Sequence, residues 1–201
     1  MSDSIKQSPE SIFRTHGGQL RMSEALSLGI SRYQLYQLRD KGITETISRG
    51  VYRLLELPAI TNPDLVTVSS RFPKAVICLI SALFWHEITT QIPHQVTVAV
   101  PRNARLPSLD YPPIQAYRFA DEAYLAGIKT VNIDGVNVQI YSVEKTLVDC
   151  FKFRNKLGMD VVLEALQLYR SRKPFKLNEL LSFAKLCRVE QVMRPYLEAG
   201  L

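Results

Sequence analysis

Residues 8–55 alternate short helix-forming segments with glycines and then end in a predicted β-hairpin. Helices are predicted through PESIFRTH, MSEALSLG and SRYQLYQLRDK, with a break at Gly17-Gly18 between the first two. The next segment, GITETISRGVYRLL, is rich in β-branched and aromatic residues around an SRG turn, where Gly50 can adopt a positive φ. Three short helices followed by two paired strands are therefore expected here.

The second and third predicted helices show the spacing of a helix-turn-helix. Ala25, Gly29 and Leu35 stand four and six residues apart. Two helices that cross steeply need a small residue at the crossing, a glycine in the turn and an apolar anchor on the second helix. Ser31 is a good N-cap for that second helix, and it would leave the first-turn N–H groups facing solvent or phosphate.

The third helix carries an outward face that its own fold does not need. At 100° per residue, a core side centred between Leu35 and Leu38 leaves polar and aromatic side chains on the opposite side. These are Tyr33, Tyr36, Gln37 and Asp40, flanked by Arg32 and Arg39. Gln and Arg can read base edges in a DNA major groove and Tyr can reach phosphates, so the face predicts DNA binding.

The hairpin resembles the wing of a winged helix, whose tip commonly touches the DNA backbone or the minor groove. The predicted DNA-binding residues are Ser31, Arg32, Tyr33, Tyr36, Gln37, Arg39, Arg49, Tyr52 and Arg53. Exposed Tyr and Arg are equally typical of protein interfaces, so a protein-docking module stays open as an alternative. Asp40 on the same face counts against DNA, unless the carboxyl end of the helix lifts out of the groove.

A second pattern begins after ELPAITNPD, a proline-rich stretch that predicts a domain edge near residues 56–63. Helices are predicted over 64–72 and 75–88, and strands over HQVTVAVP and IQAYRF. TVNIDGVNVQIY predicts a hairpin with Asp134-Gly135 in a type I′ turn. Ser142 caps a helix that ends at Gly158, and three amphipathic helices follow. The expected fold is α+β: a winged helix-turn-helix over 1–56, then a domain over 64–201 with a mixed sheet at about 75–141 and helices over 142–201.

Composition sets the class of protein. The chain has 201 residues and a net charge of +6, with basic ends and a balanced middle, which favours a polyanionic partner without requiring one. No apolar run approaches a membrane span and the start lacks a signal-peptide layout, so a cytosolic protein is expected. The three cysteines lie far apart in apolar surroundings and are predicted to be buried thiols.

Several catalytic and cofactor patterns fail on spacing. His86-Glu87 is followed by Thr90 where a second zinc ligand would stand, and the glycines form no phosphate-binding loop, so neither a metal nor a cofactor is expected. A nucleotidyltransferase would need a Gly-Ser pair, which does not occur. Glu144, Lys145 and Asp149 invite comparison with nuclease sites, but a helix dipole and an i, i+4 pair are adequate explanations. Metal-dependent cleavage stays open as an alternative.

The run YRSRKP, with Lys152, Arg154 and Lys156 one helix earlier, could extend a phosphate-binding surface.

The chain as a whole resembles the AbiEi-type antitoxins of type IV toxin-antitoxin systems. The resemblance lies in SRYQLYQLRDKG and ISRGVYRL, then ICLISALFWHEITTQIPHQVTVAVP, IYSVEKTLVDCFKFRNKLGMDVVLEAL and MRPYLEA, and it spans roughly residues 10–200. It implies a transcriptional autoregulator and no enzyme. The partners implied are double-stranded promoter DNA with inverted repeats, and a nucleotidyltransferase toxin that is opposed without a stable complex. No defined antitoxin site can be matched to residues of this chain, so the role of the carboxy-terminal domain rests on this likeness alone.

Overall fold

The computed structural model describes residues 7–48 and 50–199. The chain forms two compact units: Met1–Arg71 with Asn132–Asn137, and Phe72–Val131 with Val138–Leu201. Residues 64–71 thus have most of their contacts in the first unit, although the sequence places them after a domain edge. The domain boundary near 56–63 stays a prediction.

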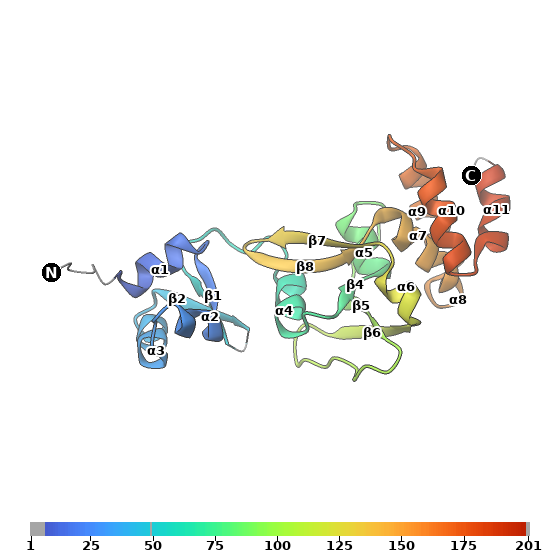
Figure 1. Ribbon diagram of the computed structural model, residues 1–201. Helices are drawn as coiled ribbons and strands as arrows, with labels where there is room; N and C mark the ends of the chain where they lie inside the picture. The colour runs from blue at the N-terminus through green and yellow to red at the C-terminus, as the bar shows by residue number, and fades with distance from the viewer. Residues whose placement is uncertain (1–6, 49, 200–201) are drawn as a thin grey trace. The chain divides into compact units, whose positions relative to one another are not determined.

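The first unit is built on three short helices and a three-stranded antiparallel sheet (Figure 1). In chain order the elements are α1 (Pro9–Thr15), β1 (Gln19–Arg21), α2 (Met22–Ser27), α3 (Arg32–Asp40), β2 (Thr44–Ser48) and β3 (Val51–Leu54), followed by α4 (Pro63–Arg71). The strand order is β1-β3-β2. This arrangement confirms the predicted amino-terminal winged helix-turn-helix.

The helix-turn-helix crossing has the predicted chemistry. Ala25 and Leu35 are completely buried, and Gly29 makes the turn at a φ of 90°. Ile30, the residue after that glycine, is buried as well. A larger side chain at the crossing would separate the two helices, and a residue other than glycine would strain the turn. The angle at which α3 leaves α2 is therefore fixed by local sequence.

Strand β1 was not predicted. Its three residues carry no periodic signal, and only Leu20 faces the core. The strand exists because Gln19, Leu20 and Arg21 pair with Arg53, Tyr52 and Val51 of β3. Pairing partners 30 to 34 residues away decide its conformation, and no short window of sequence contains them.

The second unit contains a five-stranded mixed sheet in the order β6-β5-β4-β8-β7. Its strands are β4 (Val76–Ile77), β5 (Val96–Pro101), β6 (Ile114–Phe119), β7 (Ile128–Ile133) and β8 (Val136–Tyr141). Strand β4 pairs antiparallel with β5 and parallel with β8. Asp134 and Gly135 both have positive φ, as the predicted type I′ turn between β7 and β8 requires. The tip of that hairpin, Asn132–Asn137, belongs to the first unit.

Two predicted helices of this unit need correction, and one helix was not predicted. The helix expected over 75–88 is wrong at its start, where β4 lies in the middle of the sheet and only α5 (Leu79–Trp85) is helical. A central strand is buried on both faces, so its residues are apolar without alternation and resemble a buried helix. The helix expected to end at Gly158 divides at Phe153 into α7 (Val143–Lys152) and α8 (Arg154–Leu157), and α6 (Asp121–Leu125) was not predicted.

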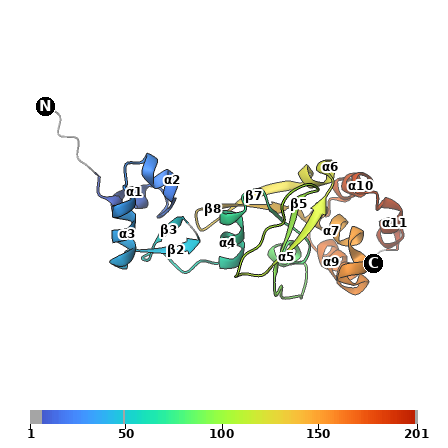
Figure 2. The same cartoon turned by 90° about the horizontal axis from the view of Figure 1, so that it is seen from below.

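The chain then ends in three helices, α9 (Met159–Arg170), α10 (Leu177–Leu186) and α11 (Glu190–Glu198), as predicted. Figures 1 and 2 show them gathered around α7 at one end of the second unit. All three cysteines are buried and reduced, which confirms their interpretation as core thiols. None of the helices in the described part of the chain is long and apolar enough to cross a membrane.

Helix α7 carries an ion pair at the centre of this unit. Lys145 Nζ lies 2.6 Å from Asp149 Oδ2, and both side chains are 0% exposed. The ammonium group also lies 4.2 Å from the ring centroid of Tyr141 and 4.9 Å from that of Phe119. Burial raises the pKa of the Asp149 carboxyl to about 6, against the opposing effect of Lys145. The predicted i, i+4 pair is present, but it is a core interaction instead of a solvated one.

Removing one partner of the buried pair should destabilise the protein more than replacing both partners with apolar residues. Asp149→Ala should lower the free energy of unfolding by about 3–5 kcal/mol, because it leaves the Lys145 charge buried without a carboxylate. The double variant Lys145→Met/Asp149→Leu should lose less than Asp149→Ala alone, since it buries no charge. Urea unfolding of the full chain measures both.

The matched control is an exposed i, i+4 pair. Arg194 Nη1 and Glu198 Oε1 of α11 lie 3.7 Å apart with side chains 51% and 69% exposed. Glu198→Ala should change the stability by less than about 0.5 kcal/mol. A cost for Asp149→Ala as small as that of the control would show that the Lys145 charge is relieved in some other way.

Candidate nucleic-acid interface

Helix α3 separates its apolar and polar residues as predicted. Leu35 and Leu38 are buried in the core of the first unit, together with Phe13 and Leu54. On the other side of the helix the Tyr33 side chain is 69% exposed and Tyr36 is 41% exposed. Arg32 is exposed and Gln37 is partly exposed. The helix therefore presents aromatic, amide and guanidinium groups together on one accessible face.

The amino-terminal end of α3 is held by a capping box. Ser31 Oγ accepts a hydrogen bond from the backbone N–H of Gln34 at 3.2 Å. Gln34 Oε1 in turn accepts from the backbone N–H of Ser31 at 2.8 Å. This reciprocal pair fixes the first turn of the helix. Ser31, predicted as a DNA-binding residue, thus already acts as a structural cap that positions the exposed Arg32 beside it.

Tyr33 and Gln37 contact each other on the exposed face. Gln37 Nε2 donates a hydrogen bond to Tyr33 Oη at 2.8 Å. The two residues are four apart, so they stand on the same side of the helix one turn from each other. Helical spacing predicts that the two residues share a face. The hydrogen bond between them could be identified only from the side-chain conformations in the structure.

Asp40 and Tyr36 hold the Arg39 side chain in place. Its Nε and Nη2 donate to Asp40 Oδ1 at 3.0 and 2.8 Å, and its guanidinium carbon lies 5.3 Å from the ring centroid of Tyr36. The hydrogen bonds to Asp40 raise the pKa of the Arg39 guanidinium. The Asp40 charge is therefore engaged within the same helix, which weakens the objection that it would repel phosphate. Lys41, at the C-cap of α3, adds an exposed cation that the prediction omitted.

Tyr52 and Arg53, which were predicted to contact DNA from the wing, are buried side chains. The Arg53 side chain is only 4% exposed, and its Nη1 lies 3.3 Å from Glu45 Oε1 on the neighbouring strand. Its Nη2 also donates to the carbonyl oxygen of Pro58. Tyr52 is buried in the core, and that burial raises the pKa of its phenol. Neither side chain is presented to a ligand, because Tyr52 packs in the core and the Arg53 guanidinium is held by Glu45 and Pro58. Arg49, the third predicted wing residue, lies outside the described residues.

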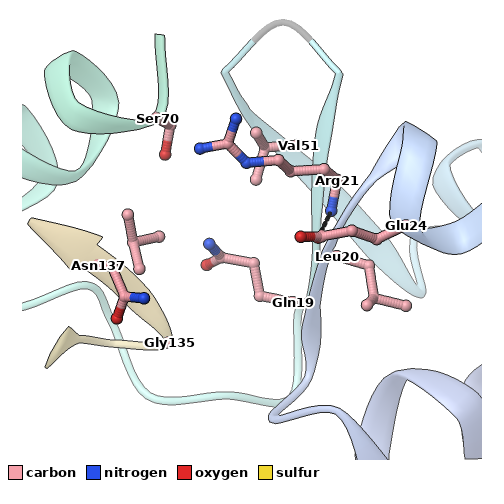
Figure 3. A pocket seen from close by; sticks show the side chains of 9 residues that line it. Gln19, Leu20, Arg21, Glu24, Val51, Ser70, Gly135 and Asn137 are labelled. Atoms are coloured by element: carbon pink, nitrogen blue, oxygen red, sulfur yellow. Dashed lines mark hydrogen bonds between the residues drawn. The ribbon is translucent and has the colours of Figure 1, made fainter. Parts of the chain in front are cut away.

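A polar hollow of about 370 Å³ lies elsewhere in the first unit (Figure 3). It is lined by residues from β1, α2, β3, α4 and the 132–137 tip: Gln19, Leu20, Arg21, Glu24, Val51, Ser70, Gly135, Val136 and Asn137. Within it, the backbone N–H of Arg21 donates to Glu24 Oε2 at 2.8 Å. No residue of α3 lines the hollow, so it is distinct from the exposed face of that helix.

The nuclease-like residues of α7 are occupied inside the second unit. Besides the buried Lys145–Asp149 pair, Glu144 Oε1 accepts a hydrogen bond from the Tyr169 hydroxyl at 2.7 Å. Glu144 is therefore a buried hydrogen-bonding partner, and the helix dipole alone does not account for it. His86 Nε2 lies 2.7 Å from the Tyr141 carbonyl oxygen, and burial lowers the pKa of its ring. No three or more His, Cys, Asp or Glu residues are grouped to hold a metal ion within 7–48 and 50–199.

The basic residues suggested as an extended phosphate surface have internal contacts. Arg172 donates to the carbonyl oxygens of His86 and Glu87, and Arg154 donates to that of Phe151 at 2.9 Å. Lys152 and Lys156 lie over the rings of Phe119 and Tyr117, at 5.9 and 5.4 Å from the centroids. Arg172, Arg154, Lys152 and Lys156 therefore have structural partners within the second unit.

The burial of Arg53 predicts a structural role for it. Arg53→Ala should lower the free energy of unfolding by about 1–3 kcal/mol, because Pro58 and Glu45 lose a buried charged partner. Arg32→Ala, on the exposed face, should change the stability by less than about 0.5 kcal/mol. Thermal unfolding followed by circular dichroism distinguishes the two. If both variants lowered the free energy of unfolding by the same small amount, Arg53 would again be a candidate for ligand contact.

The capping box predicts a measurable cost at Ser31. Ser31→Ala removes the acceptor for the Gln34 N–H and should cost about 1 kcal/mol, whereas Ser31→Asp should keep the cap. Urea unfolding of both variants tests this. A Ser31→Ala variant as stable as the wild type would contradict the role.

Comparison with known proteins agrees with this geometry. Residues 7–55 match the family described as transcriptional regulator, AbiEi antitoxin. A search of curated proteins found no match. Among solved structures, the crystal structure of the RV2827C protein from Mycobacterium tuberculosis is similar with a TM-score of 0.50 at 12% identity. The match covers 91% of this chain and 76% of that one, and it concerns the fold alone. The match to AbiEi antitoxin transcriptional regulators thus lies in the segment that contains the capped and exposed α3.

Proposed function

We propose that this protein is a DNA-binding transcriptional autorepressor and the antitoxin of a type IV toxin-antitoxin system. The exposed face of α3, opposite Leu35 and Leu38, is the observation that carries the proposal. A winged helix with a capped recognition helix and accessible Arg, Gln and Tyr side chains suits a DNA major groove. The family of residues 7–55 points to transcription regulation independently of the geometry.

The proposed roles on DNA divide between bases and phosphates. Arg32, Tyr33, Tyr36 and Gln37 meet the major groove near the amino-terminal half of α3, where Arg32 and Gln37 have the groups to read base edges and the tyrosine hydroxyls can reach phosphates. Arg39 contacts phosphate, and Arg49 at the hairpin turn is proposed for the same task from its position in the sequence. The target is double-stranded promoter DNA with inverted repeats, which two copies of the chain would occupy symmetrically.

The antitoxin role is proposed from family likeness. In that role the domain over 64–201 opposes a nucleotidyltransferase toxin in the cytoplasm without forming a stable complex. The protein-docking alternative draws on the same exposed tyrosines and arginines. The nuclease alternative loses support, because Asp149 is fully buried and bonded to Lys145. The docking reading is thus the one that a binding experiment must separate from the repressor.

The proposal predicts a salt-dependent loss of DNA affinity when the Arg39 charge is removed. Arg39→Ala should weaken binding to all sequences and reduce the slope of log K against log salt by about one, since one phosphate contact is lost. Asp40→Asn should strengthen binding, because it frees the Arg39 guanidinium and removes a negative charge. Fluorescence anisotropy with a labelled fragment of the protein's own promoter measures both.

Lys185→Ala is the charge-matched control, because Lys185 is an exposed lysine of α10 in the second unit. It should leave the salt slope unchanged. A protein that fails to retain promoter DNA at moderate salt would favour the docking module, and identical slopes for Arg39→Ala and Lys185→Ala would remove Arg39 from the interface.

A further inference from the structure

The hydrogen bond between Tyr33 and Gln37 restricts what the Gln37 amide can read. A phenol has one proton to donate and can also accept a hydrogen bond. In this structure Tyr33 Oη accepts from Gln37 Nε2 at 2.8 Å, so the hydroxyl proton remains available to another acceptor. Tyr33 is 69% exposed, so its hydroxyl can donate a hydrogen bond to a ligand.

A phosphate oxygen beside Tyr33 would make this arrangement the only possible one. Phosphate oxygens of DNA accept hydrogen bonds and cannot donate them. When the phenol O–H donates its hydrogen bond to phosphate, the Tyr33 oxygen can only accept a hydrogen bond from Gln37. The amide nitrogen of Gln37 must then face Tyr33. The Gln37 oxygen and its second N–H are then turned away from Tyr33, toward whatever lies at the helix surface. The amide can no longer exchange its oxygen and nitrogen positions.

We infer that Tyr33 and Gln37 act together as an adenine reader, in which a phosphate contact at Tyr33 orients the Gln37 amide toward one adenine in each half-site. The inference rests on the proposed function, since it requires double-stranded DNA in front of α3. Adenine presents the N7 acceptor and the N6 donor in the major groove, which match the free N–H and the oxygen of an oriented amide. Guanine presents two acceptors there, O6 and N7, so the amide oxygen would face another oxygen. Tyr33 is a positioning residue for this selection, and Gln37 makes the base contact.

The other exposed tyrosine provides an internal comparison. Tyr36 lies three residues from Tyr33 on the same helix, but its ring lies under the Arg39 guanidinium at 5.3 Å from the centroid. The described residues include no hydrogen bond from Gln37 to Tyr36, because the Gln37 amide nitrogen is directed to Tyr33. Removing the hydroxyl of Tyr36 should therefore leave the amide orientation unchanged.

Selection from a randomised double-stranded DNA library tests the inference with full-length wild type, Tyr33→Phe, Tyr36→Phe and Gln37→Ala. The wild type should enrich adenine over guanine at one position of each half-site by roughly 5- to 100-fold, the range expected for a bidentate amide–adenine contact. Gln37→Ala should make that position degenerate. Tyr33→Phe should lower the adenine preference at least about threefold, a conservative share of that range, while other positions keep their preferences. Tyr36→Phe should retain the wild-type ratio of adenine to guanine at the Gln37 position, and the loss of its own contact with the groove should lower only the affinity for the whole site.

The outcomes separate this inference from the proposed function. A wild-type protein that enriches no sequence overturns the proposed function, and with it the adenine reader. A wild type that enriches a site without a Gln37-dependent adenine overturns the reader and leaves the repressor standing. The same holds if Tyr33→Phe keeps the full adenine preference, or if Tyr36→Phe loses as much of it. Both phenylalanine variants keep the aromatic ring, so a general loss of folding does not imitate either result.

Discussion

The packing of Leu35 and Leu38 into the core of the first unit is the constraint on which the candidate interface depends. Because these two side chains hold one side of α3 against the hairpin and α1, the opposite side is left for polar groups at positions that the helical period dictates. The glycine turn at Gly29 and the Ser31 cap then fix where the helix begins. The surface proposed to meet DNA is thus rigid at its base, which lowers the entropy lost when side chains are ordered on a ligand.

Neighbouring residues arrange the polar side chains on this face before any ligand arrives. Tyr33 orients Gln37, and Asp40 with Tyr36 orients Arg39. Such contacts are weak individually on an exposed helix, but they select among side-chain conformations instead of supplying stability. Arg53 shows the opposite use of an arginine. Its guanidinium is buried against Pro58 and Glu45, where it links the end of the wing to the chain that follows.

The second unit places its charges differently. Lys145, Asp149 and Glu144 stand on one helix and are all satisfied internally, by each other, by aromatic rings and by Tyr169. Residues of this kind in a short stretch of sequence suggest an active site, and here they form part of a core. A buried ion pair is costly to assemble and costly to break, so it favours one arrangement of α7 against its neighbours over alternatives. That arrangement brings Gly127 so close that a Cβ there would lie 2.7 Å from Lys145 Cβ.

The sequence by itself determined the elements whose signals are local. Helical periodicity gave the two faces of α3, glycine and Asx chemistry gave both hairpin turns, and Ser31 and Ser142 marked helix starts that the structure confirms. Only the tertiary structure decided the short strands β1 and β4, which exist through pairing with distant strands. It also decided the burial of Tyr52, Arg53, Lys145 and Asp149. A side chain's hydropathy does not record whether a remote carbonyl, carboxylate or ring will be present to receive it, so polar residues of the core read as surface residues until the chain is folded.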